Sequence, residues 1–260
     1  MTAAQDTDTG AIMSLDGVAR AFGGIRAVDG CTFDVRPGLI TGLIGPNGAG
    51  KTTVFNLITG FLGADQGSIR LRGTELLGLA PHQVQRLGVV RTFQHLRLWN
   101  NMSVLENVLL GCATPAGENV FSLFLRAGAV QAEEARARAR AMEVLEFFGL
   151  AARAGEFAED LAYPEQKLLS MARIFASDAP VMLLDEPTSG LDGESLRRIV
   201  PLVRRLVEHG KTVLLIEHNM DLISELSDEV VFLHQGRVLA TGRPAEITRD
   251  PALTEIYFGV

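Results

Sequence analysis

The sequence has few cysteines, no long hydrophobic run and no excess of positive charge, and each of these shortages excludes a class of protein. Its two cysteines, Cys31 and Cys112, each stand alone among apolar or small residues. We therefore expect free thiols in a reducing compartment rather than a disulfide or a metal pair. No apolar stretch approaches the roughly 20 residues that a membrane-spanning helix needs. The polar start, MTAAQDTDTG, is unlike a signal peptide.

The charge balance is acidic. Thirty-one Asp and Glu residues against 24 Lys and Arg give a formal net charge of −7. A general nucleic-acid binder usually carries a basic face, so we expect no nucleic-acid partner. Hydrophobic residues make up 47% of the 260 residues, which is enough for a sizeable core in one domain or two lobes.

Strand-like and helix-like segments alternate toward both ends of the chain, which predicts a mostly parallel sheet with helices on both faces. The segment 229–242 is typical of a hairpin that turns near Gln235. The middle of the chain, residues 96–177, is helical in pattern and predicts a separate lobe. We therefore divide the chain into 1–95, 96–177 and 178–260, with the first and last parts forming one lobe. The strand-like runs are 39–44, 68–72, 89–92, 181–184 and 213–216.

The strongest local motif is GPNGAGKTT, residues 45–53, between a strand-like and a helix-like run. It fits the phosphate-binding pattern G-x-x-x-x-G-K-[ST], in which glycines let successive N–H groups face an anion at a helix start. Lys51 would reach the β- and γ-phosphates of ATP, and the Thr52 hydroxyl would bind Mg²⁺. An ordinary glycine-rich turn is the alternative. The predicted phosphate-binding residues are Gly45, Asn47, Gly48, Ala49, Gly50, Lys51, Thr52 and Thr53.

Two adjacent acids follow the apolar run in VMLLDE, residues 181–186. A strand buried on both faces suits the centre of a parallel sheet, and Asp185 would lie at its carboxyl end, where such sheets bind ligands. Asp185 would hold Mg²⁺ directly or through water, and Glu186 would orient or deprotonate an attacking water. The alternative is that Asp185 caps a helix whose first turn contains Pro187.

These motifs, followed in order by SGLD and IEHN, resemble the nucleotide-binding subunit of an ATP-binding cassette (ABC) transporter. The resemblance covers nearly the whole chain. The segments RAFGGIRAV, RTFQHLRLW and IYFG are most similar to ATPases of branched-chain amino-acid importers. The resemblance implies a RecA-like P-loop core with a mostly parallel sheet, an antiparallel β part and an inserted helical subdomain. It also implies a dimer with two ATP molecules between the subunits.

The resemblance gives roles to further residues. Phe22 matches the aromatic residue that stacks on adenine; a core phenylalanine is the alternative. Gln94 matches the glutamine that contacts Mg²⁺ and the attacking water, and His218 matches the histidine that contacts the γ-phosphate. Each of these two has a structural role at a strand end as its alternative. Ser189 and Asp192 match a loop that touches the other subunit's site, although SGLD alone predicts only a turn and a helix cap.

The segment LAYPEQKLLSMAR, residues 161–173, lies where the family has its signature helix. Its apolar spacing predicts a helix, and Pro164 suits a helix start. The usual Leu-Ser-Gly-Gly-Gln is altered at its last four positions, Ala162, Tyr163, Pro164 and Glu165; importers of this type commonly have the Ala-Tyr pair. Pro164 removes an N–H that the family offers to ATP on the opposite subunit, and Glu165 brings a carboxylate near that anion. A helix start with no further role is the alternative for Pro164.

The resemblance therefore implies an ATPase that uses ATP and Mg²⁺ to power uptake of branched-chain amino acids or related small polar solutes. Its expected partners are integral membrane permease subunits, a second ATPase subunit that is a paralogue and, indirectly, a solute-binding protein. Its expected place is peripheral, on the cytoplasmic face of the inner membrane. A soluble ABC ATPase of DNA repair or translation is the alternative, but such chains carry two cassettes or long insertions. A P-loop kinase is disfavoured by Glu186, His218 and the signature-like helix.

Overall fold

The central sheet is built from the short apolar runs of the sequence. In the computed structural model, which describes residues 10–94, 96–112 and 127–258, this sheet has the strand order β10-β9-β3-β8-β7-β6. Its strands are β3 (Ile40–Ile44), β6 (Val89–Arg91), β7 (Val181–Asp185), β8 (Thr212–Ile216), β9 (Glu229–His234) and β10 (Arg237–Gly242). β3, β7 and β8 are buried along their whole length, as strands covered on both faces must be.

The pairing of these strands is parallel except at one edge. β3 pairs in parallel with β8 and β9, and β7 pairs in parallel with β6 and β8. At the edge, β9 and β10 form the predicted antiparallel hairpin. Its turn falls at Gln235 and Gly236, which both have positive φ. The carboxyl ends of β3, β8, β7 and β6 therefore lie side by side at one edge of the sheet.

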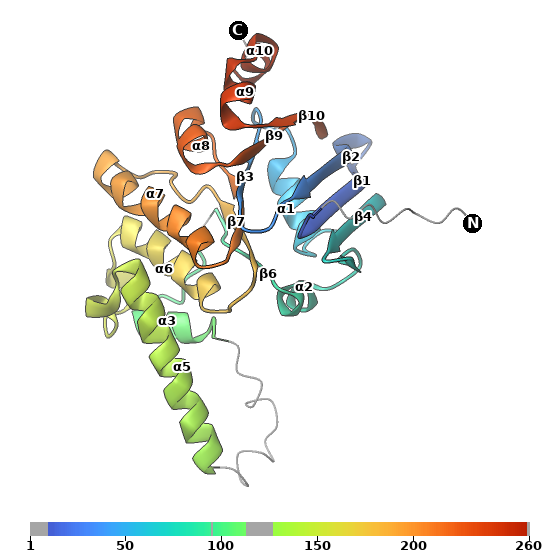
Figure 1. Ribbon diagram of the computed structural model, residues 1–260. Helices are drawn as coiled ribbons and strands as arrows, with labels where there is room; N and C mark the ends of the chain where they lie inside the picture. Colours follow the sequence, from blue (N-terminus) through green and yellow to red (C-terminus); the bar gives the residue numbers. More distant parts are fainter. Residues whose placement is uncertain (1–9, 95, 113–126, 259–260) are drawn as a thin grey trace.

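A second, antiparallel sheet covers one side of the molecule (Figure 1). It has the order β2-β1-β4-β5 and consists of β1 (Met13–Phe22), β2 (Ile25–Val35), β4 (Gln66–Leu71) and β5 (Thr74–Glu75). One apolar cluster joins both sheets and α1 (Lys51–Ile58), with Leu15, Phe55 and Leu214 among its members. The predicted antiparallel β part is thus this sheet, and it packs against the helix that follows the phosphate loop.

The described residues of the middle of the chain are mainly helical, as the pattern predicts. α3 (Val104–Leu109), α5 (Ala127–Phe148) and α6 (Tyr163–Phe175) pack on one another, and α5 extends away from the sheets (Figure 1). Residues 131–140 of α5 are mostly exposed. Another apolar cluster runs from α5 and α6 into β3, β7 and β8. Because the helical part shares this core with the sheet, the division at residues 95 and 177 stays a prediction.

Five further α-helices and two short 3-10 helices, η2 (Ala151–Arg153) and η3 (Ala158–Asp160), complete the part of the chain that the structure describes. α7 lies against β8 and α8, and α9 lies against α8, β9 and α10. Among the described helices, none combines the length and the apolar character needed to cross a bilayer. These helices are α2 (Pro81–Leu87), α7 (Gly193–Glu208), α8 (Met220–Leu226), α9 (Pro244–Arg249) and α10 (Pro251–Phe258).

Candidate active site

The phosphate loop connects β3 to α1 and is pressed tightly against its neighbours. Gly45 has φ +148°, and a Cβ there would lie 1.9 Å from the carbonyl oxygen of Leu233. Gly50, at the start of α1, has φ +105°, and a Cβ there would lie 2.3 Å from the carbonyl oxygen of Ala27. Only glycine fits at these two positions, so the backbone approaches both sheets more closely than any side chain would allow.

Lys51 is the first residue of α1, and its side chain is buried inside the loop. The Nζ donates hydrogen bonds to the carbonyl oxygens of Gly45 at 2.7 Å and Pro46 at 3.0 Å. Burial lowers the pKa of the ammonium, while Glu186 and Asp185 act in the opposite direction. A desolvated ammonium next to backbone N–H groups is suited to hold a polyanion.

A cavity of about 330 Å³ opens beside this loop. Seven of the eight predicted phosphate-binding residues line it, and Gly45 does not. Its remaining polar lining consists of Gln94, Glu186 and His218. A curled glycine loop, an ammonium and a facing carboxylate fit a nucleoside triphosphate with a water beside its last phosphate. The seven loop residues are Asn47, Gly48, Ala49, Gly50, Lys51, Thr52 and Thr53.

The three polar side chains come from the ends of neighbouring strands. Gln94 follows β6, Glu186 follows β7 and His218 follows β8. The Nε2 of His218 lies 2.5 Å from Oε1 of Glu186, and the Nε2 of Gln94 donates to Oε2 at 3.1 Å. Both oxygens of the carboxylate are therefore held in place. Such a carboxylate is oriented to accept a proton from a water at the cavity wall.

Asp185 lies behind this wall rather than on it. It is the last residue of β7 and 3% exposed, and its Oδ2 accepts a hydrogen bond from Nη2 of Arg91 at 2.6 Å. Its N–H donates to Oγ1 of Thr92 at 3.0 Å. The helix-cap interpretation of Asp185 is wrong, because no helix begins there and α7 starts only at Gly193. Of the three metal candidates, Thr52 and Gln94 line the cavity.

No cluster of three or more His, Cys, Asp or Glu side chains that could hold a metal occurs in residues 10–94, 96–112 and 127–258. A Mg²⁺ ion at this site would therefore depend on phosphate oxygens together with Thr52 and Gln94. Asp185 would support it from behind the wall. This donor set fits Mg²⁺, which is commonly held by few protein ligands together with substrate phosphates.

The signature segment forms the start of α6, as its pattern predicts. The helix begins at Tyr163 with Pro164 in its first turn. The Glu165 carboxylate accepts hydrogen bonds from Nη1 of Arg153 at 3.0 and 3.1 Å and from the N–H of Ala162 at 3.2 Å. The carboxylate is thus already engaged within its own chain. The roles of Ala162, Pro164 and Glu165 toward a nucleotide stay predictions.

The SGLD loop lies against this helix start. A Cβ on Gly190 would lie 3.3 Å from the ring of Tyr163, so the ring covers the loop. Asp192 caps α7, with its Oδ1 accepting from the N–H of Ser195 at 2.8 Å, and this bond lowers the pKa of the Asp192 carboxyl. The predicted turn and cap are present. A contact of Ser189 or Asp192 with another subunit stays a prediction.

Phe22 does not line the phosphate cavity. It ends β1 with 46% of its surface exposed, and the guanidinium of Arg20 lies 5.1 Å from the ring centre. An exposed aromatic face fits base stacking and does not fit the alternative of a core phenylalanine. Its stacking on adenine stays a prediction.

Sequence reasoning missed a set of contacts behind the cavity wall. The Tyr257 hydroxyl of α10 donates to the carbonyl oxygen of His218 at 2.6 Å. Glu217, which immediately precedes His218, is buried. Its carboxylate accepts hydrogen bonds from the N–H of Thr188 at 3.0 Å and from the Thr188 hydroxyl at 2.5 Å. Burial raises the pKa of Glu217. Lys167 of α6 also reaches the wall. The available signal was a charged residue beside apolar runs, as in VLLIE.

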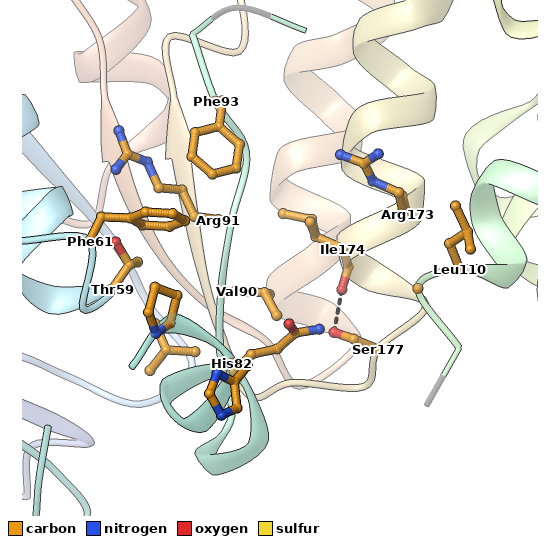
Figure 2. Close-up of a pocket in the computed structure, with 14 residues that line it drawn as sticks. Thr59, Phe61, His82, Val90, Arg91, Phe93, Leu110, Arg173, Ile174 and Ser177 are labelled. Carbon is orange, nitrogen blue, oxygen red and sulfur yellow. Dashed lines mark hydrogen bonds between the residues drawn. The ribbon is translucent and has the colours of Figure 1, made fainter. Parts of the chain in front are cut away.

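A second cavity, of about 280 Å³, lies between the sheet and the helical part. Figure 2 shows Phe61, Arg91 and Phe93 on one side of it, with Leu110 and Arg173 on the other. Phe61 and Leu110 are 52% and 53% exposed. Arg91 reaches from this groove to Asp185 behind the phosphate cavity. We call this surface the inter-lobe groove.

The site defines the class of the protein. A phosphate loop together with adjacent acids and a histidine at neighbouring strand ends is typical of a P-loop nucleotide hydrolase. The family described as "ABC transporter" matches residues 28–189. The chain belongs to the ABC transporter family, so the predicted family resemblance and the predicted ATPase activity are confirmed.

Individual relatives match this chain over almost its whole length. LivG of Salmonella typhimurium, named a high-affinity branched-chain amino acid transport ATP-binding protein, is 40% identical over 95% of this chain and 98% of its own. BraF of Pseudomonas aeruginosa, with the same description, is 39% identical over the same shares. A solved nucleotide-free cassette from an ABC transporter has a TM-score of 0.82 at 32% identity, covering 95% and 98%. The predicted fold class is therefore confirmed.

Proposed function

We propose that this chain is the ATP-hydrolysing subunit of an importer for branched-chain amino acids or related small polar solutes. The observation that carries the proposal is the Glu186 carboxylate held by Gln94 and His218 beside a complete phosphate loop. The printed descriptions of LivG and BraF support the solute class. A soluble ABC ATPase is not favoured, since the relatives that match almost the full length are transport proteins by name.

In this proposal each residue of the site has a separate role in ATP hydrolysis. The loop N–H groups and Lys51 would bind the β- and γ-phosphates, and Thr52 and Gln94 would hold Mg²⁺, which would supply charge neutralisation when bound. Glu186 takes the proton of the attacking water. His218 and Gln94 hold both carboxylate oxygens in position, and His218 would also contact the γ-phosphate.

The proposed partners include permease subunits that dock in the inter-lobe groove. Exposed Phe61 and Leu110 offer an apolar surface, and Arg91 joins that surface to Asp185. A segment of a membrane subunit seated there would sense changes at the phosphate cavity through this arginine. The chain would act peripherally at the cytoplasmic face of the inner membrane, with a solute-binding protein as an indirect partner.

The proposed ATPase partner is a paralogue with a fuller signature. Each ATP would lie between one subunit's phosphate loop and the other's signature. This chain has a full set of hydrolytic residues but an altered signature, so two copies would use those residues poorly. The proposal is thus two unequal sites, with the more active one built on this chain's phosphate loop.

The test is co-expression with candidate permease, paralogue and solute-binding proteins, followed by reconstitution in vesicles. We expect ATP hydrolysis that rises when the loaded solute-binding protein is added, and none with Glu186→Gln. Leu110→Glu should prevent assembly with the permease while the isolated subunit still binds ATP. Failure to copurify with any membrane subunit, with ATPase activity intact, would overturn the transport proposal.

A further inference from the structure

Lys167 is a buried cation with a defined partner near the active site. It lies on α6, is 5% exposed, and its Nζ donates to the backbone carbonyl oxygen of Glu186 at 2.8 Å. The same Nζ lies 5.4 Å from the ring centre of Tyr163, one helical turn earlier. Burial lowers the pKa of Lys167, against the opposing effects of Glu217 and Glu186. A buried ammonium stays charged only where its contacts offset the cost of desolvation, so the contacts of Lys167 fix the place of its Nζ.

The ammonium also stands where three parts of the molecule meet. A small cavity is lined by Lys167 and Ser170 of α6, by Gln94 and by the strand end Asp185 and Glu186. The signature helix is therefore in direct contact with the residues that form the phosphate-cavity wall.

The peptide that Lys167 holds is in an unusual conformation. Glu186 has φ +49°, in the left-handed region that a non-glycine residue seldom adopts. Its N–H donates to the carbonyl oxygen of Ile216 at 3.0 Å, and its own carbonyl also accepts from the N–H of Ser189 at 3.2 Å. A strained residue keeps its conformation only when its surroundings fix it from several sides. Of these three hydrogen bonds to the Glu186 backbone, the one from Lys167 is made by a side chain.

We propose that Lys167 is a positioning residue that couples the signature start of α6 to the catalytic carboxylate of the same chain. Tyr163 and Lys167 share one face of α6, so a displacement of the helix start also displaces the ammonium. The Glu186 backbone then shifts, and with it the carboxylate held by Gln94 and His218. The inference rests on the proposed pairing of two cassettes around ATP. It adds that contact of the signature segment with the other subunit would change the position of Glu186 in the same chain.

The first test is Lys167→Met in the assembled transporter, which keeps the side-chain length and removes the donor. We expect kcat for ATP hydrolysis to fall about tenfold or more, as for loss of a charged hydrogen bond. KM for ATP should stay within about twofold, because the phosphate loop is untouched. Lys167→Arg should restore most of kcat. Lys167→Gln should lie between them and serves if the methionine variant does not fold.

The matched control is Lys211→Met. Lys211 is 6% exposed, burial lowers its pKa, and its Nζ lies 3.8 Å from Asp178. It precedes β8 and so lies at the opposite end of that strand from His218. We expect a similar loss of thermal stability with kcat unchanged. A fall in kcat as large as that of Lys167→Met would overturn the positioning role.

A second set of variants, made in the Glu186→Gln subunit, distinguishes failure of this inference from failure of the proposed function. ATP should trap the dimer of the Glu186→Gln subunit with its ATPase partner, and it should trap that dimer equally well when the subunit also carries Lys167→Met, because ATP binding is intact. If Glu186→Gln alone traps no dimer, the proposed pairing fails. If it traps one and Lys167→Met, in an otherwise unchanged chain, hydrolyses ATP at the normal rate, only the Lys167 inference fails.

Discussion

The two halves of ATP chemistry in this chain are built in different ways. The phosphate-loop half (residues 45–53 with Gln94, Glu186 and His218) takes its groups from four neighbouring strand ends of one sheet. The signature half (residues 162–165) is the exposed start of a single helix, with Tyr163 45% exposed. The first is fixed by the core of its own chain. In the proposed dimer the second half acts only when another subunit faces it, so folding of its own chain constrains its residues less.

Glu186→Gln is the change with the largest expected effect, and it tests whether the phosphate-loop half is complete. The amide fills the same space but cannot act as a base, so we expect hydrolysis to fall about 10²- to 10⁴-fold while ATP binding persists. Turnover by the purified complex and equilibrium binding of ATP measure the two properties separately. Unchanged turnover would remove Glu186 from the catalytic role.

Lys51→Ala tests the same half through binding. It removes an ammonium that complements the phosphates, and a hydrogen bond to a charged group is worth about 1.5–3 kcal/mol. We expect the Kd for Mg·ATP to rise about tenfold to hundredfold, measured by titration of the isolated subunit. Lys211→Ala is the matched control, since Lys211 is also buried but precedes β8, at the opposite end of that strand from His218. Normal affinity in Lys51→Ala would contradict the phosphate-loop assignment.

Pro164→Gly with Glu165→Gln tests the signature half. The double change returns an N–H and an amide, and we expect the site that this signature completes to hydrolyse ATP up to about tenfold faster. Arg153 would keep Glu156 as a partner, with Nε to Oε1 at 2.5 Å, so stability should change little. Activity is measured for each site by disabling the other with Glu186→Gln or its equivalent. If neither site changes, Pro164 is only a helix start and the asymmetry is wrong.

Tyr257→Phe has the smallest expected effect and tests how far the phosphate-loop half extends. It removes one hydrogen bond to the carbonyl of His218, worth about 0.5–1.5 kcal/mol. We expect kcat to fall twofold to tenfold, roughly the same free energy, with the KM for ATP unchanged. A change in the KM for ATP without a change in kcat would show that Tyr257 does not act through His218.

Part of this arrangement is predictable from sequence because it depends on local pattern. Apolar runs predict the buried strands, and glycine spacing predicts the loop after β3. The first two strands, β1 and β2, do not stand out, because they carry charged residues such as Arg20 and Asp29 and pair with shifts in register. Their core-facing residues therefore do not alternate cleanly.

Contacts between distant segments account for most of what sequence reasoning missed. Lys167 reaches the Glu186 carbonyl, and the pattern of α6 predicts only that the helix has an apolar face. The partner of Glu165 is Arg153, which precedes the helix in a separate turn. A motif identifies residues that contact a ligand, whereas these residues contact other residues. Their roles depend on how the helical part packs against the sheet.

The close approach of Gly45 to Leu233 affects how inactive alleles are to be interpreted. A substitution at Gly45 would push apart the loop and β9 in the centre of the molecule, so the allele would be null through loss of folded protein. In the proposed transporter, an allele at Lys51 would instead leave an assembled but inert subunit, able to occupy the permease and to interfere with normal copies. Genetic dominance therefore separates two classes of mutation that lie six positions apart in one motif.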